Sequence, residues 1–187
     1  MKQLFVVIAL LMIFASCGFA QEGDWSEPVN GIRARLSVYT PDELNPRCYR
    51  VLIEIQNVSP FAGQMKIRYS PERVTFQVAD KTGKRFLERS NNPWSGQGGT
   101  GWEPTLLPNG GTIKFPIHLP GTGYRLTDTA ILDMGAGQTW MIPQDGTTYF
   151  LSGRFQLERQ NGDHPYNPYI DWSGTLLLPP VEIPIRE

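Results

Sequence analysis

The stretch that decides the fold is Ile32-Arg33-Ala34-Arg35-Leu36-Ser37-Val38, in which apolar and polar residues alternate strictly. Successive side chains of a β-strand point to opposite faces, so the four apolar residues share one face and the polar residues share the other. One buried face and one wetted face are typical of an antiparallel sheet, because parallel sheets are covered on both sides. The stretch therefore predicts a strand of an antiparallel sheet.

The same period of two recurs along the rest of the chain. Clear repeats lie in residues 49–56, 74–78, 113–119, 149–157 and 181–185. The 19 glycines and 16 prolines are accompanied by 40% apolar residues, which favours many strands and turns over disorder. Two facing sheets would bury the apolar stripes. The sequence therefore predicts an all-β protein, an antiparallel β-sandwich of about eight or nine strands.

Glycine and proline mark the ends and edges of these strands. Short turns are predicted at residues 79–84, 108–111, 145–146 and 161–162. Pro116 cannot donate to a strand ladder, so we expect it on an edge strand or at a bulge. Pro179-Pro180 is expected to divide the last strand in two.

Residues 1–20 have the order of a secretory signal peptide. A charged start at Lys2 is followed by an apolar run from Leu4 to Phe14 and then by small residues. That run is shorter than the roughly 20 residues that cross a bilayer, so no membrane span is predicted. We expect an exported protein, secreted or periplasmic.

The sequence is compatible with two alternative processing sites. Cleavage after Ala20 would leave residues 21–187 as a single sandwich domain. Residues 14–17, Phe-Ala-Ser-Cys, resemble a bacterial lipobox instead. In that case the leader is residues 1–16, and Cys17 is lipidated and anchors the domain to a membrane.

Charge and cysteine content exclude some classes of function. The formal net charge is −1 at pH 7, which gives no indication of a nucleic-acid surface. The mature chain keeps only Cys48, together with Cys17 if that residue is lipidated, so no internal disulfide framework is expected. The two histidines are His118 and His164, and no catalytic or phosphate-binding motif accompanies them.

A polar loop in residues 88–108 is the strongest candidate binding site. Trp94 and Trp102 could stack on sugar rings, as exposed aromatic side chains do in glycan sites. Amides and a carboxylate that could bind the sugar hydroxyls lie beside them, at Asn91, Asn92, Gln97 and Glu103. The alternative is that both tryptophans fold back and cap an open end of the sandwich.

A second predicted loop, residues 159–172, carries oxygen ligands at Asp163, Asn167 and Asp171. These residues lack the spacing of a known calcium motif, so we interpret the segment as a turn and predict no metal or cofactor. A pair of carboxylates for hydrolysis could come from Glu54, Glu103, Asp133 or Asp171, but nothing distinguishes one of these acids. No catalytic residue is assigned.

One tripeptide, Asn57-Val58-Ser59, matches a glycosylation acceptor. Such short matches are frequent, and we interpret Asn57 as a turn residue that ends a strand.

Four segments resemble exported bacterial Ig-like domains. They are residues 25–36, 51–59, 108–112 and 180–185. The resemblance implies a β-sandwich that occurs alone or as an accessory module of cell-envelope proteins, without catalytic residues.

The predicted function is therefore that of a non-catalytic exported or cell-envelope protein that binds a protein or glycan through its surface. One alternative is a carbohydrate-binding module that uses the loop of Trp94 and Trp102. A second alternative is a hydrolase with an unrecognised carboxylate site.

Overall fold

The computed structural model describes residues 20–39, 50–60, 63–69, 73–84, 87, 104–117, 129–134, 138–143, 145–158 and 170–184. These residues form twelve strands and no helix. The strands are β1 (Ala20–Glu22), β2 (Ile32–Tyr39), β3 (Arg50–Asn57), β4 (Met65–Arg68), β5 (Val74–Asp80), β6 (Pro104–Leu107), β7 (Thr112–Pro116), β8 (Thr129–Asp133), β9 (Thr139–Pro143), β10 (Tyr149–Leu157), β11 (Ile170–Asp171) and β12 (Gly174–Glu182).

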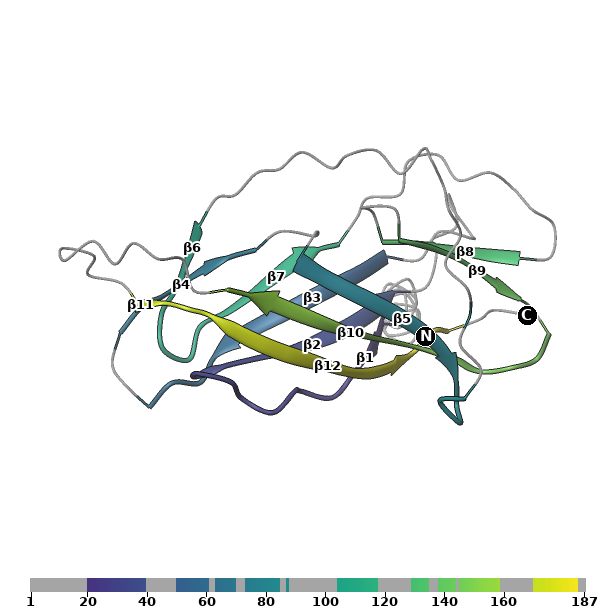
Figure 1. Cartoon of the computed structure of the whole chain (residues 1–187), viewed down its shortest axis with the longest axis horizontal. Coiled ribbons are helices and arrows are strands. Elements are labelled where there is room, and N and C mark those ends of the chain that lie inside the picture. Colours follow the sequence, from purple (N-terminus) through teal and green to yellow (C-terminus); the bar gives the residue numbers. More distant parts are fainter. Residues whose placement is uncertain are drawn as a thin grey trace, which may run out of the picture.

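Two antiparallel sheets form the body of the fold. One has the strand order β1-β2-β3-β7 and the other has the order β12-β10-β5. The second sheet lies over the first, with β12 in contact with β2 (Figure 1). A small sheet of order β11-β4-β6 lies at one end of the molecule, and the hairpin of β8 and β9 lies toward the other end. The predicted all-β class with antiparallel sheets is confirmed.

The facing sides of the two large sheets form the core. Most residues on the apolar faces of the strands are buried, as the period of two predicts, whereas Ile113 and Phe115 are partly buried. The buried residues include Ile32, Ala34, Leu36, Val38, Val51, Ile53, Ile55, Val74, Phe76, Val78, Tyr149, Leu151, Phe155, Leu157, Leu176, Leu178 and Val181. Burial of this continuous apolar layer is the main favourable contribution to folding.

Two segments predicted as loops prove to be partly strand. Residues 104–107 are β6, which pairs antiparallel with β4, and residues 170–171 are β11, which pairs parallel with β4. Pro104 is tolerated because it is the first residue of its strand. Both strands are too short to show a period in the sequence. Short strands of this kind raise the count above the predicted eight or nine.

The two proline predictions have different outcomes. Pro116 lies in β7, an edge strand of its sheet, as predicted. The prediction that Pro179-Pro180 divides the last strand is wrong, because β12 continues through both residues. The register with β10 instead shifts between the pairs Leu151–Val181 and Gly153–Leu178. The extra residue of β12 is accommodated as a bulge. Because β12 is an edge strand, residues without an N–H group, such as these prolines, are tolerated in it.

The predicted turns at 79–84, 108–111 and 145–146 are confirmed, and the turn at 161–162 lies outside the described residues. A further turn, Asn30-Gly31, was not predicted. Both residues have positive φ, 48° and 79°, which is the conformation that Asn-Gly favours in tight hairpins. Two hydrogen bonds between Val29 and Ile32 close this turn.

A side chain covers the open edge of β5. Gln138 is buried just before β9. Its Nε2 donates to the Val74 carbonyl at 2.8 Å, and its Oε1 accepts from the Phe76 N–H at 3.0 Å. These bonds occupy backbone groups that an exposed edge would present to another chain.

Aromatic rings join the small sheet to both large sheets. Tyr69, directly after β4, stacks on Phe115 of β7 with ring centroids 4.4 Å apart. Phe155 of β10 lies 6.0 Å from Tyr69 and 5.5 Å from Trp172, which follows β11. Burial raises the pKa of the Tyr69 phenol, whose hydroxyl has no hydrogen-bond partner within the described part of the chain.

Tyr69→Phe tests this burial. At neutral pH we expect the free energy of unfolding to stay unchanged or to rise by about 1 kcal/mol, because an unpaired hydroxyl leaves the core. Above pH 10.0, the ordinary phenol value, the unfolded chain loses a proton that the folded chain keeps. The stability of the unmodified protein therefore falls further with pH than that of the variant.

Urea unfolding across this pH range measures both effects. The control is Tyr149→Phe, which removes a buried hydroxyl that bonds to Asp145 at 3.4 Å and should cost about 1 kcal/mol. Equal losses in the two variants at neutral pH would contradict the assignment for Tyr69.

Candidate functional site

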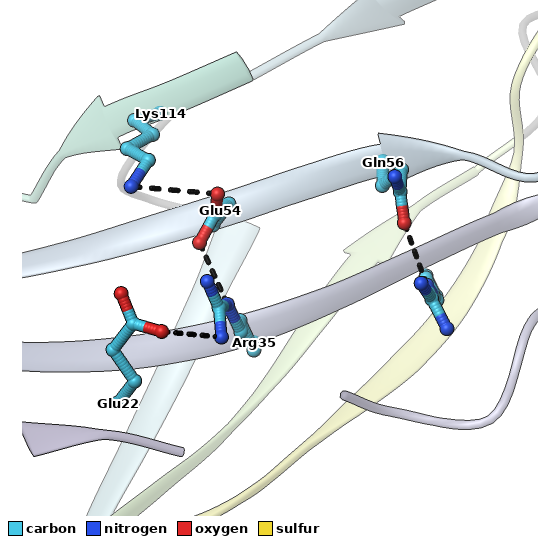
Figure 2. A network of polar contacts seen from close by, with 6 residues as sticks. Glu22, Arg35, Glu54, Gln56 and Lys114 are labelled. Atoms are coloured by element: carbon cyan, nitrogen blue, oxygen red, sulfur yellow. Dashed lines mark hydrogen bonds and ion pairs between the residues drawn. The ribbon is translucent and has the colours of Figure 1, made fainter. Parts of the chain in front are cut away.

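A row of alternating charges crosses the outer face of the four-stranded sheet. Glu22 of β1, Arg35 of β2, Glu54 of β3 and Lys114 of β7 form the row (Figure 2). The strand register places them there, because Arg35 is the partner of Glu54 and Glu54 is the partner of Lys114. Side chains directly opposite each other on one face of a sheet interact.

The contacts within this charge row are short near its centre. Arg35 Nε lies 2.6 Å from Glu54 Oε2, and its Nη1 lies 2.7 Å from Glu22 Oε2. Lys114 Nζ lies 3.4 Å from Glu54 Oε1. The Glu54 side chain is only 8% exposed, whereas that of Lys114 is 47% exposed. Basic neighbours thus cover Glu54 on both sides.

The charge of Arg35 is stabilised by its surroundings. Burial alone would lower the pKa of its guanidinium, but hydrogen bonds and charges from Glu54 and Glu22 raise the pKa above the ordinary value. Arg35 therefore stays protonated and acts as a fixed donor between two carboxylates.

Trp25 extends the charge row along β2. The Cζ atoms of Arg33 and Arg35 lie 4.6 and 4.7 Å from the centroid of its ring, within the range of cation–π contacts. Ser26 holds this segment beside β2, since its N–H donates to the Ala34 carbonyl and its Oγ accepts from the Ala34 N–H.

A second polar link runs parallel to the charge row. Arg33 Nε donates to Gln56 Oε1 at 2.8 Å, between β2 and β3. The outer face therefore carries side chains held in fixed positions by one another. Such a face can present hydrogen-bonding groups to a partner without first ordering them.

Glu54 and Asp171, the two candidate acids whose carboxylates the structure describes, are not brought together. Glu54 belongs to the charge row, whereas Asp171 lies in the small sheet at 4.0 Å from both Lys66 Nζ and Arg68 Nη2. Glu103 and the side chain of Asp133 lie outside the described residues. The two acids that can be placed are therefore both paired with basic groups, in different sheets.

Other residues that the sequence analysis considered as candidates also fall outside the described ranges. They are Trp94, Trp102, Asn91, Asn92, Gln97, Cys17, Asp163 and Asn167. Within those ranges, no three His, Cys, Asp or Glu side chains gather closely enough to hold a metal ion.

Sequence reasoning did not find the charge row, and it singled out neither Glu22 nor Lys114. The alternation placed Arg35 and Glu54 on outward faces, and it predicted that these faces are wetted. Glu54 is instead buried, because its neighbours in register are long basic side chains that cover it. Only the pairing of β2 with β3 and of β3 with β7 reveals this contact.

Comparisons with protein-family models, with curated proteins and with solved structures find no match to this chain. Functional inference therefore depends on the chain's own residues and their geometry.

Glu54→Gln tests the charge row. The substitution leaves Arg35 partly buried with one charged partner instead of two, so we expect a loss of about 1–2 kcal/mol in the free energy of unfolding. Removal of one partner from a fully buried pair would cost more. Lys114→Gln should change stability by less than about 0.5 kcal/mol, because exposed ion pairs contribute little.

Urea denaturation of both variants at low and high salt measures the difference. Equal effects of the two substitutions, or an effect of Glu54→Gln that disappears in high salt, would show that the row is held only by weak surface attraction.

Proposed function

We propose that this protein is a non-catalytic, exported cell-envelope protein that binds a protein or glycan through the outer face of its four-stranded sheet. The observation that carries the proposal is the charge row with Trp25, an ordered polar and aromatic surface. An aromatic ring and charge-assisted donors are groups that dominate binding at protein surfaces.

Two further observations support a binding role over hydrolysis. Glycoside hydrolysis in its usual form needs two carboxylates facing one substrate. Glu54 and Asp171 are each paired with two basic groups and lie in separate sheets. Glu54 and Asp171 therefore do not form a catalytic pair with each other.

Export to the cell envelope rests on the sequence of residues 1–20 and on the resemblance to exported Ig-like domains. An Ig-like sandwich spanning residues 21–187 is part of this proposal. The described residues include no helix that is long and apolar enough to span a membrane. The intact mass of the natural protein distinguishes cleavage after Ala20 from lipidation at Cys17.

A carbohydrate-binding module that uses Trp94 and Trp102 is the second candidate. The composition of their loop favours it, since two tryptophans lie among amides and a carboxylate. The two candidates place the binding surface in different parts of the chain, which allows one experiment to distinguish them.

Blocking substitutions test the outer face. Thr112 is exposed on β7 and is the register partner of Gln56, so Thr112→Arg places a bulky group beside the charge row without removing any of its members. Thr75→Arg is the matched control, on the outward side of the other sheet at an exposed position of β5.

The processed proteins are immobilised and exposed to separate polysaccharide and protein fractions of the cell envelope. We expect Thr112→Arg to reduce capture at least tenfold and Thr75→Arg to leave it unchanged. Loss of polysaccharide capture in Trp94→Ala with Trp102→Ala, together with full capture by Thr112→Arg, would favour the carbohydrate-binding module. No capture by the unmodified protein would contradict both.

A further inference from the structure

The only Asn-x-Ser/Thr sequence of the chain is Asn57-Val58-Ser59, and the fold encloses it. We propose that a glycan on Asn57 and the native fold exclude each other, so that this acceptor can be modified only before the chain folds. The inference concerns the folded domain and does not depend on what the domain binds.

Both polar atoms of the Asn57 side chain are hydrogen-bonded inside the protein. The residue is 0% exposed. Its Nδ2 donates to the Leu107 carbonyl at 3.0 Å, and its Oδ1 accepts from the Ser59 N–H at 3.0 Å. N-glycosylation would replace one Nδ2 hydrogen with a bond to the anomeric carbon of the sugar. The proton and the lipid pyrophosphate of the oligosaccharide donor would leave.

The backbone prevents Asn57 from turning outward. Its N–H donates to the Gly111 carbonyl at 3.0 Å, and its carbonyl accepts from the Gly110 N–H at 2.9 Å. The next residue is also held, because the Val58 N–H donates to the Gly31 carbonyl at 2.8 Å. Ser59, which completes the acceptor, is buried as well.

A glycan is bulky and polar and must lie in solvent. To place one on Nδ2, the chain would have to break the contacts that join the end of β3 to the turn before β7. The protein therefore requires an export route in which this acceptor is not glycosylated before folding.

Expression of the whole chain in a eukaryotic secretory host tests the proposal. We expect every glycosylated molecule of the unmodified sequence to be protease-sensitive and retained in the cell. Unglycosylated molecules should be secreted and protease-resistant. An inhibitor of lipid-linked oligosaccharide synthesis leaves the sequence unchanged and should restore secretion of folded protein.

A matched variant tests whether a glycan at another position is tolerated. Asp145→Asn combined with Ser59→Ala removes the buried acceptor and creates one in the turn of residues 145–147, where position 145 is exposed and Oδ1 can still accept from the Thr147 N–H. We expect this variant to be glycosylated, secreted and protease-resistant. Ser59→Ala alone should be secreted without a glycan, and it reports any effect of that substitution on folding.

The results with the unmodified protein and with the Asp145→Asn variant decide the proposal. Secretion of glycosylated unmodified protein with the protease resistance of the unglycosylated form would overturn the proposal. If the unmodified protein carries no glycan while the Asp145→Asn variant does, folding closes the acceptor before the enzyme reaches it, and the proposal stands.

Discussion

The hydrogen bonds of Asn57 hold the end of the sandwich together. Through its side chain and backbone, this residue joins β3 to the carbonyl of Leu107 and to Gly110 and Gly111 of the turn before β7. A buried amide whose nitrogen and oxygen are both hydrogen-bonded fixes geometry, because displacement leaves polar groups unpaired in the core. Asn57 thus fixes the position of the small sheet relative to the four-stranded sheet and to the turn between them.

A second set of contacts completes the same corner. The indole N–H of Trp172 donates to the Val29 carbonyl at 2.9 Å, and Asn30 Nδ2 donates to the Ser173 carbonyl at 2.8 Å. Trp172 also stacks on Phe155. The hairpin before β2 therefore holds the segment that enters β12, so this corner connects both large sheets. The outer charge row lies on the four-stranded sheet, which this corner joins to the second large sheet.

Much of the fold could be predicted from the sequence, and little of the site. The alternation around Leu36 and Ile53 predicted the buried faces, and the glycine turns predicted where strands end. The two-residue strand β11 carries no period, and the bulge at Pro179-Pro180 depends on a pairing with β10 that the sequence does not specify. The Arg35–Glu54 contact likewise depends on register, which is a property of two strands at once.

Native-state hydrogen exchange tests the central role of this corner most directly. If the corner opens only with the whole domain, the amides of Val58, Gly110 and Trp172 exchange with the same free energy as those in the centre of β3. Exchange of these three amides at a free energy well below the global value would contradict the account, because the corner would then open locally while the sandwich stays folded.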